Sequence, residues 1–168
     1  MHYEDAVIKK LIEKFELEGP AKLARKYRYG DIFVMPKSDL PLVTIAKTGT
    51  ITTPASNMES EYMMSMAINV IYDFTSDLRQ DRTLQAGINS VYDLIEGRDE
   101  NYQLKPESLL YILQKYQVLD NNLWIMAAPN DRIETVYGIG NQRRGPGIFS
   151  VEGLIRFNVK AHLQRPGL

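Results

Sequence analysis

The side chains that could perform chemistry are few, and none stands in the spacing of a known catalytic site. Glu59 and Glu61 would share one face of a strand, the placement that glycosidase or two-metal chemistry needs. The histidines, His2 and His162, have no serine or carboxylate neighbour at the spacing of a nucleophilic triad or a metal site. The chain contains no cysteine, which excludes disulfides, cysteine-ligated zinc, iron–sulfur clusters and cysteine nucleophiles. We therefore expect no enzymatic activity, no metal and no cofactor.

The glycine-rich segment GIGNQRRGPG, residues 138–147, is the other candidate for a binding site. A loop that cradles phosphate needs its glycines between a strand and a helix, whereas the residues that follow here alternate as in a strand. The pattern favours the tip of a β-hairpin that carries Arg143 and Arg144 toward a partner. A guanidinium group suits that role, because its planar fork binds carboxylates through two hydrogen bonds. A small ligand-binding or enzymatic domain that uses Glu59, Glu61 and this loop stays open as an alternative.

Interface candidates outside that segment come from three places. Arg156 lies on the polar face of the last expected strand, and Trp124 follows a polar turn, where it could be core or an anchor between subunits. The segment 49–57 has no periodicity and is rich in threonine, so we expect a long exposed loop or an irregular β-arm there. The residues expected to contact a partner are therefore Arg143, Arg144, Arg156, Thr50, Thr52, Thr53, Asn57 and Trp124.

Length and composition are those of one ordinary globular domain covering residues 1–168, with 44% hydrophobic and 24% charged residues. No apolar run approaches the roughly 18 residues of a transmembrane helix, and the N-terminus carries acids where a signal peptide needs bases. Residues 58–107 hold ten acids against four bases, whereas residues 141–168 hold five bases against one acid. Such opposite patches suit head-to-tail contacts between copies or binding to a polyanionic surface, and solvated faces without a partner are the alternative.

Hydrophobic periodicity predicts the elements that must position these residues. Helical spacing predicts helices over residues 5–15, 21–27, 83–95 and 106–116, with 97–116 as a helical insertion. Alternation predicts strands over residues 31–35, 42–48, 62–74, 123–127, 133–139 and 149–163. The two longest strands could pair in one antiparallel sheet. We expect an α+β fold: an antiparallel (mixed) β-sheet with two to three helices packed on one face, and with long loop and hairpin extensions.

In this order of elements, the chain resembles the tail-terminator and head–tail completion (neck) proteins of tailed bacteriophages. An amphipathic helix at 5–15 precedes the proline-containing strand DLPLVTI at 39–45. The long alternating strand YMMSMAINVIYDF at 62–74 follows a polar segment, and the closing strand VEGLIRFNVKAHL at 151–163 follows a hairpin. The resemblance covers most of the chain.

The resemblance implies a structural virion protein, assembled in the host cytoplasm, that forms a hexameric ring at the tail–neck junction. Such a ring would end polymerisation of the tail tube at its head-proximal end and join the tail to the neck. The implied partners are further copies of the chain, the tail tube with or without sheath proteins, and neck or connector proteins. DNA would be present only as the genome passing through the lumen, and no membrane is implied. A stopper, a connector or a tube-like subunit is the alternative within the same class.

Overall fold

The computed structural model describes residues 3–30, 35–54, 59–74, 84–120, 123–126, 132–143 and 148–164. Its α-helices are α1 (Tyr3–Glu18), α3 (Leu84–Glu96) and α4 (Leu109–Lys115), with two 3₁₀ turns, η1 (Ala21–Leu23) and η2 (Lys37–Asp39). Its strands are β1 (Tyr27–Tyr29), β2 (Leu42–Pro54), β3 (Glu59–Asp73), β4 (Val118–Asp120), β5 (Leu123–Met126), β6 (Glu134–Arg143) and β7 (Phe149–Gln164).

The described strands form one mixed sheet in the order β1-β2-β3-β7-β5-β4, with β6 also paired to β7. Only β1 and β2 run parallel. The predicted pairing of the two longest strands is confirmed, since β3 and β7 pair antiparallel from Glu59↔Gln164 to Asp73↔Ser150. On the side of β7 that faces away from β3, residues 149–156 pair with β6 and residues 158–161 pair with β5. The expected α+β class is therefore correct.

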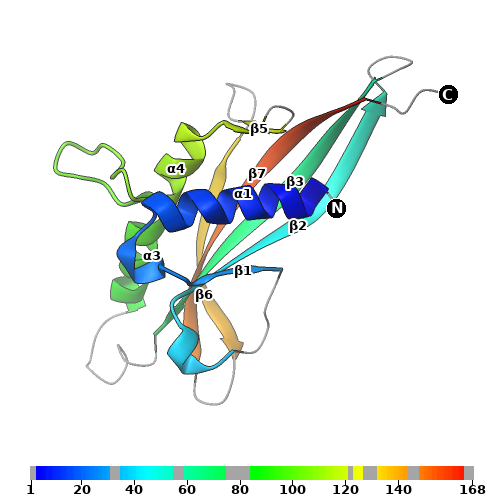
Figure 1. Cartoon of the computed structure of the whole chain (residues 1–168). Coiled ribbons are helices and arrows are strands. Elements are labelled where there is room, and N and C mark those ends of the chain that lie inside the picture. Colours follow the sequence, from blue (N-terminus) through cyan, green and yellow to red (C-terminus); the bar gives the residue numbers. More distant parts are fainter. Residues whose placement is uncertain are drawn as a thin grey trace.

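The helices lie on one face of this sheet, and the core lies between the two layers (Figure 1). The apolar stripe predicted for the first helix is buried, with Phe15 at its C-terminal end. Alternate residues of β3 and β7, such as Ile68 and Ile155, face it and are fully buried. Full burial of each such side chain contributes about 1.5–3 kcal/mol, so the alternation seen in the sequence fixes which face of each strand is covered. The opposite face, called here the open face, carries the intervening residues of both strands, and at one end of it Met35 packs on Leu42 and Ile71 in a second small core.

Residues 21–27 do not form the predicted second helix; they form η1, a turn and the start of β1. Tertiary packing overrides the local preference here, because Tyr27 is buried and stacks on Phe15 with ring centroids 5.5 Å apart. Gly19 follows the last residue of α1, and its amide donates to the Phe15 carbonyl at 2.7 Å. A Cβ at this position would lie 2.5 Å from the Tyr27 hydroxyl, so only glycine permits that approach.

The predicted helix at 106–116 begins later, at Leu109, because Ser108 caps it. The Ser108 hydroxyl accepts from the Tyr111 amide at 3.4 Å and donates to the Lys105 carbonyl at 2.8 Å. Residues 97–108 therefore form a hydrogen-bonded loop, and the expected helical insertion is helical only in α4. The strand predicted at 31–35 falls almost wholly outside the described residues.

Segment 49–57 is strand through Pro54, so the expectation of a loop is wrong there and that of an irregular β-arm is correct. The irregularity is a register shift between Lys47 and Gly49, opposite Met66 and Ser65. Residues 49–54, 59–65 and 158–164 form a paired extension of β2, β3 and β7, called here the distal arm, that runs past the N-terminal end of α1 (Figure 1). Strand β5 pairs with residues 158–161 of this arm. In the part of the chain that is described, no helix is long and apolar enough to cross a membrane.

Candidate interaction surfaces

The structure distributes the predicted contact residues over the whole length of β7. Arg143 ends β6 opposite Phe149, Arg156 pairs with Glu134, and Thr53 lies beside Glu61, which pairs with His162. Positions 149 and 162 are thirteen residues apart along one strand, or roughly 43 Å at about 3.3 Å per residue. The predicted residues therefore cannot form one contact patch. Arg144 and Asn57 lie outside the described residues, and the strand predicted at 133–139 continues through Arg143, where a turn was expected.

The threonines of the distal arm are exposed on β2, where Thr50 pairs with Met64 and Thr52 with Tyr62. Ile51 between them is 64% exposed, a large apolar side chain left in water. On this side of the sheet, β1 pairs only with residues 43–45 of β2. Beyond those residues, the outer edge of β2 has no strand neighbour within the described ranges. Trp124 belongs to β5 and pairs with Lys160.

A polar pocket of about 380 Å³ lies on the open face of the sheet, beside Arg156. The Arg156 side chain is 59% exposed, and its guanidinium lies 3.5 Å from the Glu134 carboxylate. Within the described ranges, Arg132 has no carboxylate in ion-pair contact. The residues that line this open-face pocket include Thr48, Ser65, Arg132, Glu134, Arg156 and Asn158. Two guanidinium groups against one carboxylate leave the pocket with a net positive charge that suits an anionic group.

The uncharged polar residues of the open-face pocket are held in place by hydrogen bonds between neighbouring strands. The Ser65 hydroxyl donates to Asn158 Oδ1 at 3.1 Å, across the β3–β7 pair. The Thr48 hydroxyl, at the irregularity in β2, donates to the Ser65 carbonyl at 3.1 Å. Sequence reasoning found Arg156 but missed Arg132, Thr48 and Ser65. The alternation that places Arg156 and Asn158 on one face of the last strand was the only feature of the sequence that pointed to this pocket. The other lining residues come from β2, from β3 and from residues 132–134, which lie far apart in the sequence.

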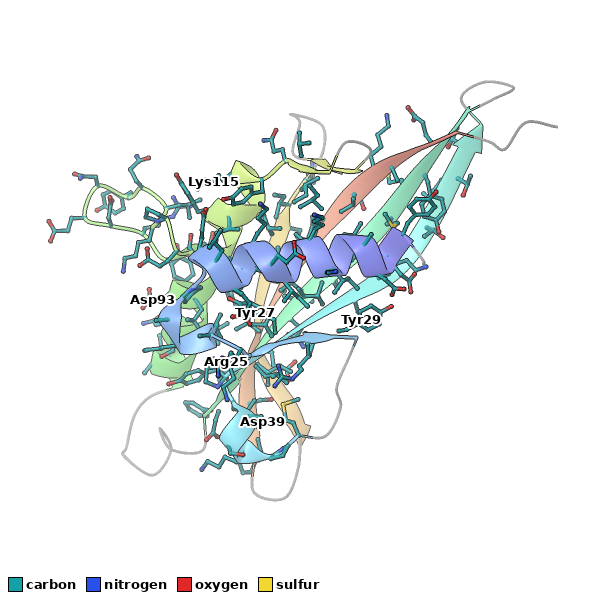
Figure 2. The ribbon with its side chains drawn as sticks, viewed as in Figure 1. Arg25, Tyr27, Tyr29, Asp39, Asp93 and Lys115 are labelled. Carbon is teal, nitrogen blue, oxygen red and sulfur yellow. The ribbon has the colours of Figure 1, made fainter. Side chains whose placement is uncertain are left out.

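A second, apolar groove of about 670 Å³ runs between α1 and β1. Ile8, Ile12 and Leu17 of α1 and Tyr29 of β1 line it, and the charged groups at its rim are Asp5, Lys9, Glu13 and Glu16. Figure 2 labels Tyr29 on β1, next to this helix. The Tyr29 hydroxyl donates to Glu4 at 2.9 Å, and this bond raises the pKa of Tyr29 to about 12. With three acids and one base, the rim of the α1/β1 groove is acidic.

Of the carboxylate pair considered for catalysis, only Glu61 has a described side chain, and the side chain of Glu59 lies outside the part of the chain that is described. Glu61 forms an ion pair with Lys160 at 2.6 Å, on the exposed distal arm. Within the described residues, no group of three or more histidine, aspartate or glutamate side chains could hold a metal ion. Comparison with protein-family models and with curated protein sequences finds no match. The site must therefore be interpreted from the geometry of this chain alone.

Proposed function

We propose that the chain is a structural subunit of a tailed-phage particle, a tail terminator that assembles into a ring at the head-proximal end of the tail tube. The ring would stop polymerisation of the tube and join the tail to the neck. The observation that carries the proposal is the distal arm, which projects past the helical layer with the exposed Ile51 and with a β2 edge that pairs with no other strand among the described residues. Monomeric proteins usually cover or charge such an edge, since it invites pairing with another chain.

A neighbouring copy of the chain would pair with the β2 edge of the distal arm and cover Ile51. A subunit with one patch at the distal arm and different patches elsewhere makes heterologous contacts, which close into a ring when the rotation between copies allows it. The resemblance to neck proteins in the order of elements supports the closed ring over an open filament. The Glu61–Lys160 ion pair favours a structural role for Glu61 over a catalytic one.

The test is the solution mass of the purified chain by light scattering, with negative-stain images of the same peak and of the chain mixed with tail tubes. A hexameric ring, alone or on tube ends, is the expected result. Ile51→Asp should abolish it without changing the circular dichroism spectrum, whereas Leu17→Asp, at a leucine that is 73% exposed on α1, is the matched control. A monomer that also fails to bind tube ends would contradict the proposal, and a copy number other than six would favour a stopper or connector.

Charge reversal at Arg143 and Arg144 tests the predicted contact residues separately. We expect the double substitution to abolish joining of heads and tails while the subunit stays folded, because guanidinium groups bind carboxylates of the partner. Normal joining by the variant would refute the role of these two arginines and leave the ring itself untouched.

A further inference from the structure

The loop at residues 97–105, called here the Tyr102 loop, is held in one conformation by its own hydrogen bonds. The Asp99 carboxylate accepts from the amides of Asn101 at 2.8 Å and Gln103 at 3.0 Å. The Arg98 guanidinium donates to the Tyr102 carbonyl at 2.9 Å, and the backbone of residue 98 bridges to Leu104. A loop built in this way loses little conformational freedom when it binds.

This loop presents an aromatic side chain to solvent. The Tyr102 side chain is 81% exposed. Its backbone has a φ of +62°, in the left-handed region that residues other than glycine rarely adopt. Exposed Glu100 lies two residues before it, and within the described ranges no cation is in ion-pair contact with Glu100. Tyrosine is one of the residues enriched among interface anchors, and a rigid loop presents it at low entropic cost.

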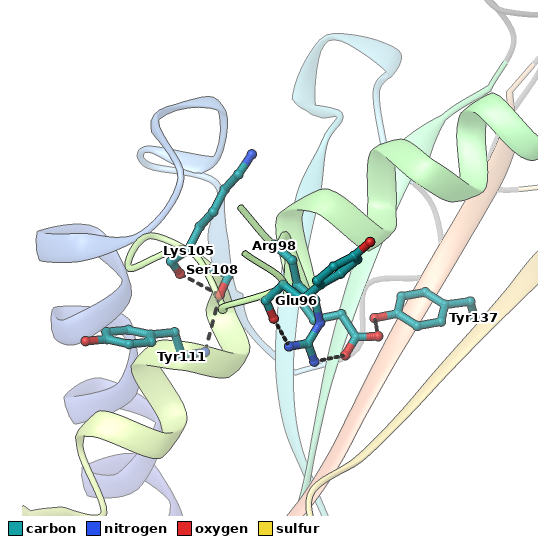
Figure 3. A network of polar contacts seen from close by, with 7 residues as sticks. Glu96, Arg98, Lys105, Ser108, Tyr111 and Tyr137 are labelled. Atoms are coloured by element: carbon teal, nitrogen blue, oxygen red, sulfur yellow. Dashed lines mark hydrogen bonds and ion pairs between the residues drawn. The ribbon is translucent and has the colours of Figure 1, made fainter. Parts of the chain in front are cut away.

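The base of the loop is fastened to the sheet. Glu96, at the end of α3, accepts from the Tyr137 hydroxyl of β6 at 2.8 Å and lies 4.0 Å from the Arg98 guanidinium (Figure 3). At the other end, the Ser108 hydroxyl donates to the Lys105 carbonyl (Figure 3). The loop therefore projects from the helical layer as a fixed knob (Figure 1).

Two pockets in the described part of the chain could receive such a knob, and charge distinguishes them. The α1/β1 groove is apolar and has an acidic rim, so it would repel Glu100. In the open-face pocket, Arg132 has no acidic partner among the described residues and Arg156 shares one acid, so the pocket would attract Glu100. A carboxylate between two guanidinium groups can accept several charge-assisted hydrogen bonds.

We propose that the Tyr102 loop of one copy docks in the open-face pocket of the next copy, with Glu100 bound by Arg132 and Arg156. The inference rests on the proposed ring and names one contact within it. The loop belongs to the helical layer and the pocket to the opposite face of the sheet, so the contact joins two copies head to tail. That is the heterologous arrangement that a ring requires.

Engineered cysteines test this contact cleanly, because the chain has none of its own. Asn101→Cys keeps Tyr102 and Glu100, and Ser65→Cys places a thiol in the pocket with little change in volume. One variant is activated as a mixed disulfide and mixed with the other, and cross-linked dimers are measured by non-reducing electrophoresis. Gln114→Cys on α4, also exposed, replaces Asn101→Cys as the matched control, and Leu17→Cys reports on the α1/β1 groove.

We expect cross-linking of position 101 to position 65 and background yield with positions 114 and 17. Glu100→Arg on the loop chain, or Arg132→Glu on the pocket chain, should lower the yield to that background. The two reversals together should restore it, because they exchange the charges across the contact.

The outcomes separate this contact from the ring. A ring in negative stain without the 101–65 cross-link, or with a 101–17 cross-link instead, overturns the contact and leaves the proposed function standing. A charge-dependent 101–65 cross-link in open chains supports the contact and contradicts the closed ring. Background cross-linking with no assembly of any kind overturns the contact as well.

Discussion

Replacing Gly153 with alanine should destabilise the fold, because α3 packs directly on the backbone of β7 at this glycine. A Cβ added there would lie 2.4 Å from Ile95 Cδ1 and 2.6 Å from Val91 Cγ1. Both of these side chains are fully buried, so neither can move into solvent. Either the helix must rise from the sheet or the two side chains must leave their preferred rotamers.

Overpacking of this kind costs about 1–3 kcal/mol of unfolding free energy. For a chain of this size, each kcal/mol lowers the melting temperature by about 2–4 °C, so a loss of roughly 2–12 °C follows. Ile95→Val removes the atom that approaches most closely and by itself costs about 0.5–1.5 kcal/mol. In the double variant, that clash is absent, so the combined loss should be smaller than the sum of the two single losses by about 1 kcal/mol.

The assay is urea unfolding followed by circular dichroism, at one fixed protein concentration because assembly would raise the apparent stability. Gly138→Ala is the matched control, since a Cβ on this β6 glycine meets no atom within 4 Å. We expect it to change the unfolding free energy by less than about 0.5 kcal/mol. The reasoning is refuted if Gly153→Ala has the same urea midpoint as the wild type. It is also refuted if the losses of unfolding free energy of Gly153→Ala and Ile95→Val are additive in the double variant.

Two further predictions concern the ends of helices. Ser108→Ala should cost about 0.5–2 kcal/mol in the same urea assay, because it removes the cap from the Tyr111 amide, and an unchanged urea midpoint would contradict this role. Lys115 and Tyr116 hold the pKa of Glu18 below its ordinary value of 4.5 by hydrogen bonding to its carboxylate. The resulting stabilisation is present above that ordinary value and is lost as the pH falls through the folded-state pKa. The difference in urea midpoint between wild type and Glu18→Gln should therefore shrink between neutral and acidic pH, and a difference that stays constant to pH 3 would contradict the assignment.

Helix α1 could be predicted from the sequence, whereas the residues that its two ends contact could not. Its apolar stripe repeats at helical spacing, and Gly19 and Pro20 stop it, which are local properties of the chain. At its far end, Glu18 meets Lys115 and Tyr116 of a segment almost a hundred residues later. At its near end, Glu4 binds both Tyr29 and Lys47. No periodicity in the sequence encodes these partners, because they depend on how α1 lies across the sheet.

The strands show the same division. Alternation located β3 and β7 closely, since one face of each had to be apolar to cover the core. It did not extend β2 past residue 48, because the register shift between Lys47 and Gly49 breaks the alternation while the pairing with β3 continues. The helix predicted at residues 21–27 is wrong for a related reason. Strand β1 has only three residues, which is too short for alternation to be recognised against the local helical preference. Its position depends on pairing with β2 and on the stacking of Tyr27 on the Phe15 ring.

The sequence by itself determined the α+β class, the core face of each long element and the polar face that carries Arg156, because these follow from the periods of apolar residues along single segments. Only the tertiary structure decided which polar groups meet. The open-face pocket needs a bulge residue from β2, a serine from β3, two residues from β7 and Arg132 from the segment before β6, brought together by strand register. The base of the Tyr102 loop likewise depends on the Glu96–Tyr137 hydrogen bond, which joins α3 to β6. The open-face pocket arises from long-range geometry, because in the sequence its residues lie apart with nothing local to connect them.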